Sequence, residues 1–196
     1  MCNLFTETPP VLKWKKLVKS KINEYWINVV ENDAKSKSSL NYLKARLHGG
    51  QIHNVWKSAS FDNISVRKAC VKARILTGSY TLQKDRATFY KLKETSHCQL
   101  CSDGEEDKRH FLLKCNYLEI VRKLFMNALS NFLLNFDISV RKSLSSDVQL
   151  LQLITHVIHA SIPLILQNDA NRQKLESIAR GLCFSLHRER CIILET

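Results

Sequence analysis

Four residues in one short stretch constrain the fold of this chain more than any other feature: Cys98, Cys101, His110 and Cys115. Their array, C-x2-C-x8-H-x4-C, offers three thiolates and one imidazole, a set with which Zn²⁺ fills a tetrahedral structural site. No coordination position would stay open for water or substrate, so the sequence predicts one structural zinc ion in a CCHC knuckle. The alternative is four unconnected side chains of a reduced protein. His97 could replace a ligand, but its adjacency to Cys98 favours a neighbouring polar residue.

The residues between the ligands fit a compact metal loop. The polar stretch 102–106 contains Gly104 and can reverse the chain after the first ligand pair, and Asp107 can cap a following helix. A separation of five residues is about 140° around an ideal helix. We therefore expect His110 or Cys115 to lie where that helix begins or distorts.

Composition and periodicity predict an all-α protein. The chain has 196 residues, 44% of them hydrophobic, with only 5 Gly and 3 Pro, which favours a packed helical fold over disorder. Apolar residues recur at helical spacing almost throughout, with no convincing alternating strand. The predicted architecture is a bundle-like helical array with the knuckle inserted between helices. Its segments are a basic region (1–97), the knuckle (98–116) and a C-terminal helical region (117–196).

The cysteine count and the N-terminus bear on the compartment. The chain has 7 Cys, an odd number, and shows no N-terminal signal peptide. The four cysteines outside the array have no pairing pattern and are interpreted as buried or free thiols: Cys2, Cys70, Cys183 and Cys191. An intracellular, reducing compartment is expected, and the cluster Lys13–Lys21 is a weak candidate for a nuclear import signal.

The positive charge lies in the first half of the chain. The formal net charge is +12, and residues 1–97 hold 18 Lys and Arg against 7 Asp and Glu, whereas residues 98–196 hold 12 against 11. Such an asymmetry is typical of a protein that binds the backbone of RNA or DNA, because basic side chains displace condensed counterions from the phosphates. The alternative is a set of solvated helix faces that bind nothing.

The basic half is expected to form several helices. An amphipathic helix follows Pro10, with its lysines largely off an apolar stripe whose aromatic residues are interpreted as core and not as stacking platforms for bases. A short helix should run from Ser38 or Ser39 to Gly49. In the segment 65–80, another helix should end at Gly78. A helix capped by Thr81 then leads to the knuckle. Six basic residues of the last two helices are the predicted nucleic-acid contacts: Arg67, Lys68, Lys72, Arg74, Lys84 and Arg86.

The C-terminal region also has helical periodicity. One helix should run from about 117 to Phe136, and Ser145 or Ser146 should cap the next. The stretch 148–168 carries no charged residue, but its polar residues favour a buried or interface helix over a membrane span. Its two histidines, His156 and His159, are interpreted as tolerated helix residues and not as a second metal pair. A last helix should cover about 170–190.

Part of the chain resembles a known family. The stretch VKARILTGSYTLQ (71–83), Arg86-Ala87, Phe89 and the CCHC array with its HFLLxC segment are similar to the C-terminal zinc-binding region of non-LTR (LINE-type) retrotransposon reverse transcriptases. The likeness covers residues 11–125. It implies that the four array residues are the zinc ligands, that the module grips RNA or DNA, and that the remainder of a reverse transcriptase is a partner.

The departures from that family concern catalysis. The chain has no paired aspartates to hold two Mg²⁺ ions, no endonuclease constellation, no Gly-rich phosphate loop and no nucleophile elbow. We therefore expect no enzymatic activity, no small-molecule substrate and no membrane partner. The main hypothesis is a non-catalytic, zinc-stabilised nucleic-acid-binding module. Two alternatives stay open: a zinc-stapled helical protein-interaction domain, and a decayed retroelement fragment with no selected activity.

Overall fold

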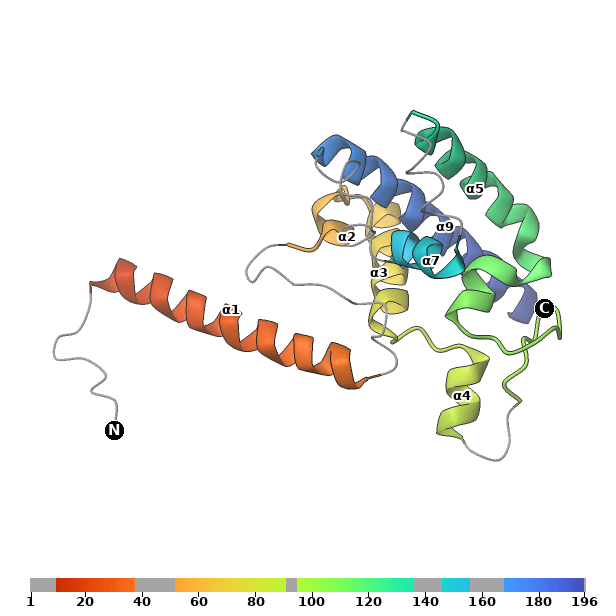
Figure 1. The fold of residues 1–196 in the computed structure, drawn as a ribbon, viewed down its shortest axis with the longest axis horizontal. Coiled ribbons are helices and arrows are strands. Elements are labelled where there is room, and N and C mark those ends of the chain that lie inside the picture. Colours follow the sequence, from red (N-terminus) through yellow and green to blue (C-terminus); the bar gives the residue numbers. More distant parts are fainter. Residues whose placement is uncertain (1–9, 38–51, 91–94, 136–145, 156–167, 196) are drawn as a thin grey trace. The chain divides into compact units, whose positions relative to one another are not determined.

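The computed structural model describes residues 10–37, 52–90, 95–135, 146–155 and 168–195 (Figure 1). Within these ranges every regular element is a helix, and the one β-type pairing is an isolated bridge between His97 and Glu105. The all-α fold class is therefore confirmed. The chain forms two compact units, Met1–Ile52 and His53–Thr196, so the knuckle, the C-terminal helices and the end of the predicted basic region belong to one unit.

The described part of the first unit is one long helix, α1 (Val11–Ser36). It begins after Pro10, whose carbonyl accepts the N–H of Trp14 at 2.9 Å, and it ends at Lys37. The interpretation of its aromatic residues as core is not what the structure shows, because Tyr25 and Trp26 are 62% and 58% exposed. The lysines are also not largely off the apolar stripe as expected, because Lys15 and Lys19 lie on the same side of the helix as Trp26, and burying them would desolvate their charges. The predicted helix at 38–49 lies outside the described residues.

Helix α9 (Asp169–Glu195) organises the second unit. It packs against α3 (Asn63–Thr77) and α5 (Glu119–Leu133), and the shorter α2 (Asn54–Lys57) and α7 (Asp147–Thr155) also contact it (Figure 1). Its buried apolar residues recur at helical spacing: Leu175, Ala179, Leu182, Cys183 and Leu186. The predicted last helix is thus confirmed and extends further at its C-terminal end.

Helix α3 has the predicted stop but a different buried face. Gly78 ends it with a φ of 73°, a left-handed conformation that glycine adopts without steric cost. The apolar spacing of this helix would place Val66 and Cys70 on the buried face with Ala69, but both are exposed, whereas Lys72 is 0% exposed. Lys72 Nζ lies 2.6 Å from Glu176 Oε1 on α9, so the face turned toward α9 includes this ion pair.

Two helix caps test the predicted boundaries. Helix α4 (Gln83–Phe89) begins after Leu82 and not after Thr81, because the Asp85 carboxylate accepts the N–H of Leu82 at 3.0 Å. The predicted Ser146 cap is confirmed, since its hydroxyl accepts the N–H of Gln149 at 3.3 Å.

Two of the described C-terminal helices, α5 and α7, are shorter than the predicted ones. Helix α5 ends at Leu133, and the region of Phe136 falls outside the described residues. Helix α7 covers only the first part of the uncharged stretch, and His156 and His159 also lie outside the described ranges. Among the helices that the structure describes, none combines the length and apolar character needed to cross a bilayer.

Gly181 of α9 lies close against the Phe125 ring of α5, and Gly181→Ala should destabilise the protein. A Cβ at this position would lie 2.6 Å from Phe125 Cε1, so the ring or the helix must move. We expect a loss of about 1–3 kcal/mol from overpacking, partly offset by about 1 kcal/mol of helix propensity. Urea unfolding measures the net change. Ser177→Ala on the exposed side of α9 is the control, and a stabilised Gly181→Ala variant would contradict the close packing.

Candidate metal centre

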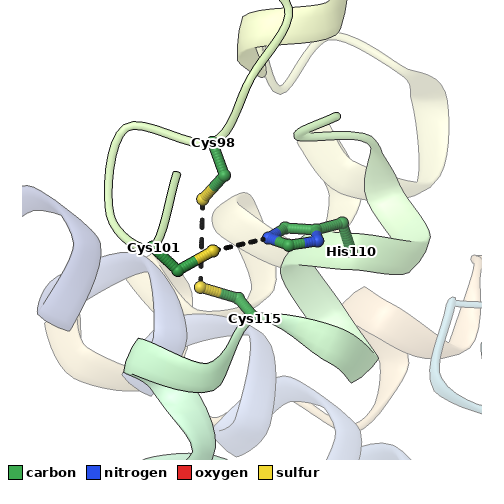
Figure 2. A group of neighbouring side chains, drawn as sticks. All are labelled: Cys98, Cys101, His110 and Cys115. Atoms are coloured by element: carbon green, nitrogen blue, oxygen red, sulfur yellow. Dashed lines mark hydrogen bonds between the residues drawn. The ribbon is translucent and has the colours of Figure 1, made fainter. Parts of the chain in front are cut away.

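The four residues of the array come together in space. One ligand atom from each of Cys98, Cys101, His110 and Cys115 can be chosen so that all lie within 4.8 Å of one another (Figure 2). Cys98 Sγ is 3.9 Å from Cys115 Sγ, and Cys101 Sγ is 3.3 Å from His110 Nε2. Thiolates at the usual zinc–sulfur bond length of a tetrahedral site are about 3.8 Å apart. The side chains are therefore close enough to bind one metal ion.

A tight loop positions the first two cysteines. Gly104 adopts a φ of 79°, and its carbonyl accepts the N–H of Cys98 at 2.9 Å. Ser102 also has a positive φ, 56°, and its N–H returns to the Cys98 carbonyl at 2.8 Å. These contacts confirm the predicted chain reversal after Cys101. His97 stays outside the cluster, since it is exposed and lies 3.0 Å from the Thr95 hydroxyl through Nδ1.

A π-helical turn positions the other two ligands. Asp107 caps it by accepting the N–H of His110 at 2.7 Å, as predicted. The turn covers His110–Lys114, and the Cys115 N–H bonds the His110 carbonyl at 2.8 Å across five residues. A π-turn is wider than an α-turn, so it brings a residue five positions ahead back beneath the first. This is the distortion that the spacing predicted.

Arg122 holds the end of the π-turn. Its guanidinium donates to the Leu112 carbonyl at 2.9 Å and to the Cys115 carbonyl at 2.8 Å, and the side chain is 7% exposed. Helix ends leave carbonyls without intrahelical partners, and buried ones are costly without a donor. A cation of α5 therefore fixes the backbone of the fourth ligand.

The burial of two sulfurs opposes their ionisation unless a cation binds beside them. Burial raises the pKa of the Cys98 thiol to about 12, and the N–H groups of Leu100 and Cys101 act in the opposite direction. Burial likewise raises the pKa of Cys115, and the N–H groups two and three positions further along oppose this effect. Each buried thiol thus faces a pair of backbone donors suited to a thiolate. A metal ion supplies the remaining charge that keeps such thiolates ionised.

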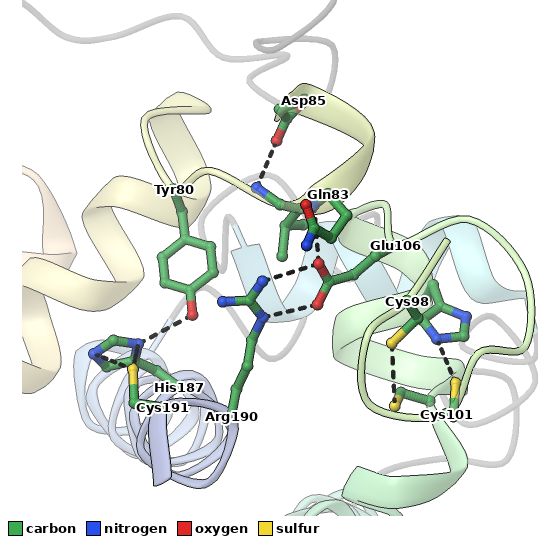
Figure 3. A network of polar contacts seen from close by, with 12 residues as sticks. Tyr80, Gln83, Asp85, Cys98, Cys101, Glu106, His187, Arg190 and Cys191 are labelled. Atoms are coloured by element: carbon green, nitrogen blue, oxygen red, sulfur yellow. Dashed lines mark hydrogen bonds and ion pairs between the residues drawn. The ribbon is translucent and has the colours of Figure 1, made fainter. Parts of the chain in front are cut away.

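Glu106 connects the metal loop to the rest of its unit (Figure 3). Its carboxylate is 1% exposed and pairs with Arg190 of α9, through Nε at 2.7 Å and Nη2 at 2.9 Å. It also accepts the N–H of Gln83 at 2.9 Å, while its carbonyl accepts that of Lys84 at 3.3 Å. The metal loop thereby caps α4 and binds α9. Sequence reasoning missed this residue, because nothing local separates it from the exposed Glu105.

Aromatic packing supports the His110 side of the cluster. The ring of Phe111, the next residue, stacks on Tyr80 with centroids 5.4 Å apart. Tyr80 is 3.0 Å from His187 Nδ1 through its hydroxyl, and burial raises the pKa of Tyr80 to about 12. The guanidinium of Arg74 lies 6.0 Å from the centre of the Tyr80 ring. The rings of Tyr80 and Phe111 thus connect Arg74 to the π-turn that carries His110.

The six predicted nucleic-acid contacts divide in the structure. Arg67 and Arg74 are exposed and lie seven residues apart, on one face of α3. Lys68 and Arg86 are half-buried, and Lys84 is exposed but lies 2.6 Å from Glu105.

Lys72 must be removed from that set. It is fully buried, and Glu176 takes up its charge. The charge count could not reveal this, because the partner is 104 positions away.

The four residues of the array can together offer a closed coordination sphere to one metal ion. Four protein ligands would complete a tetrahedral coordination sphere, which leaves no open position for substrate.

Comparisons of the chain with protein-family models, with curated proteins and with solved structures returned no match.

Proposed function

We propose that this protein is a non-catalytic nucleic-acid-binding module, stabilised by one structural zinc ion and similar in role to the C-terminal region of a non-LTR retrotransposon reverse transcriptase. The observation that carries the proposal is the surface of α1. Lys13, Lys15, Lys16 and Lys19 are all exposed there, and no acidic residue lies between Val11 and Asn23. Clustered cations of this kind match the phosphate backbone of RNA or DNA.

Zinc is the metal that fits the donor set. Three thiolates and one imidazole are soft and borderline ligands, unlike the oxygens that Mg²⁺ and Ca²⁺ prefer. Iron–sulfur clusters are generally held by cysteines alone, apart from Rieske-type centres with two histidines. A CCHC site whose ligand atoms all lie within 4.8 Å of one another therefore favours Zn²⁺.

Salt dependence tests the proposal. Affinity for a labelled single-stranded RNA or DNA, measured by fluorescence anisotropy, should fall by orders of magnitude between about 50 and 200 mM salt if about six phosphates are bound. Arg67→Gln/Arg74→Gln should weaken binding and reduce the slope by about 0.7 for each phosphate that the variant no longer neutralises. Lys123→Gln/Arg188→Gln makes the same charge change at exposed positions of α5 and α9 and should have a smaller effect. Absence of binding at low salt would contradict the proposal.

A second candidate is the zinc-stapled protein-interaction domain. One observation favours it: Tyr117, Ile120 and Leu124 are 60%, 82% and 69% exposed and recur at helical spacing near the start of α5. An exposed apolar stripe is typical of a surface that binds another protein. Such a domain would show no salt-sensitive binding to nucleic acid, so the same titration separates the two functions.

A further inference from the structure

Lysines and aromatic rings share one side of α1. Lys15, Lys19 and Trp26 are spaced by four and seven residues, and Lys21 and Tyr25 by four, so they form two rows along the helix. The rows meet where Tyr25 and Trp26 pack edge to face, with ring centroids 5.5 Å apart. We call these five residues the aromatic–lysine face.

This face is accessible. Tyr25 and Trp26 are 62% and 58% exposed, and its three lysines are exposed as well. Lys21 forms an ion pair with Glu24 at 2.8 Å, with both side chains largely in solvent. Surface pairs of this kind contribute little free energy and exchange readily for another anion. Lys15 and Lys19 make no ion pair within the described part of the chain.

The mixture of residues distinguishes between partners. A helix that lies on a membrane keeps its lysines and its aromatic residues on opposite faces, because the rings enter the acyl region. Here both kinds of residue share one face. Proteins that bind single-stranded nucleic acid combine cations that follow the phosphates with rings on which the bases stack. The bases of a duplex are paired and stacked on one another, so they do not offer free faces to Tyr25 and Trp26.

We infer that the aromatic–lysine face of α1 is a binding site for single-stranded nucleic acid, with phosphates at Lys15 and Lys19 and unpaired bases stacked on Tyr25 and Trp26. The inference rests on the proposed function and adds the strandedness of the ligand. It also assigns a site outside the six basic residues predicted from the sequence.

The test uses the full-length, metal-loaded protein and three probes: fluorescein-labelled oligothymidylate, a labelled DNA duplex, and phosphatidylserine vesicles. Tyr25→Leu/Trp26→Leu should weaken oligothymidylate binding tenfold or more, with an unchanged salt slope, because stacking releases no counterions. Duplex binding should not change. Leucine favours helix, so the circular dichroism of this variant should match that of the parent.

Charge variants separate phosphate contacts from general attraction. Lys15→Gln/Lys19→Gln should reduce the salt slope for oligothymidylate by about 1.4, or 0.7 for each phosphate. Lys123→Gln/Arg188→Gln removes the same charge from exposed positions of α5 and α9, outside the face, and should change the slope less.

Three outcomes would overturn the inference. If the leucine variant keeps its oligothymidylate affinity while Arg67→Gln/Arg74→Gln loses it, the site lies on α3 and the proposed function stands. If the leucine variant loses only vesicle binding, the partner is a membrane. If the parent protein binds neither oligothymidylate nor duplex at low salt, the proposed function fails as well.

Discussion

Removal of the metal is expected to unfold the segment from Cys98 to Cys115 and to destabilise the unit that contains it. A structural zinc site contributes on the order of 10 kcal/mol of folding free energy, which is comparable to the total stability of most domains, about 5–15 kcal/mol. Phe111, which contacts Tyr80, and Glu106, which pairs with Arg190 and caps α4, lie within the same segment, so loss of the metal should also loosen α4 and α9. Titration with a strong chelator, followed by circular dichroism and elemental analysis, measures both the helicity and the metal content.

Single substitutions should reproduce the effect of the chelator. Cys115→Ser removes a buried ligand and should give protein without stoichiometric metal and with reduced helicity. Cys70→Ser is the matched control, because this cysteine is exposed on α3 and lies outside the cluster. A Cys115→Ser protein that keeps the parent's helicity and melting temperature would show that the four side chains do not hold a structural ion.

Glu106→Gln is expected to be strongly destabilising, although Glu106 is not a metal ligand. It removes the anion that pairs with Arg190, whose side chain is 12% exposed, and so leaves a guanidinium in a largely buried site without its partner. Breaking a buried ion pair from one side costs about 3–5 kcal/mol. Urea unfolding of metal-loaded protein gives the free energy. Faster hydrogen exchange at the Gln83 amide would report the loosened start of α4.

A double-mutant cycle distinguishes the ion pair from simple loss of packing. Glu106→Gln/Arg190→Met should recover part of the stability that Glu106→Gln removes, because methionine leaves no buried charge. Lys84→Met is the control, since it breaks the exposed pair with Glu105 and should cost less than about 1 kcal/mol. If Glu106→Gln lowers the free energy of unfolding no more than Lys84→Met does, the Glu106–Arg190 pair does not connect the metal loop to α9.

The sequence predicted those parts of the site that depend on neighbours within a turn or two. The ligand spacing identified Cys98, Cys101, His110 and Cys115, and the five-residue gap before Cys115 predicted the distortion that the structure shows as a π-turn. The caps at Asp107, Gly78 and Ser146 were also predictable, because a cap depends on one side chain or one backbone conformation.

The aromatic residues of α1 show where periodicity was insufficient. A stripe at helical spacing indicates which residues share a side, but not whether another element covers that side. Tyr25 and Trp26 follow the apolar spacing and are nevertheless exposed. The lysines interleaved with the apolar residues are the signal in the sequence for this outcome.

By itself, the sequence determined the helical class, the four candidate metal ligands and the caps at Asp107, Gly78 and Ser146, since each follows from local geometry and local chemistry. The tertiary structure alone decided which charges are buried and with which partners. Lys72 pairs with Glu176 over 104 positions, and Glu106 pairs with Arg190 over 84. A charge enters the interior where an opposite charge or backbone carbonyls meet it, and for these two pairs that meeting is set by how distant helices pack.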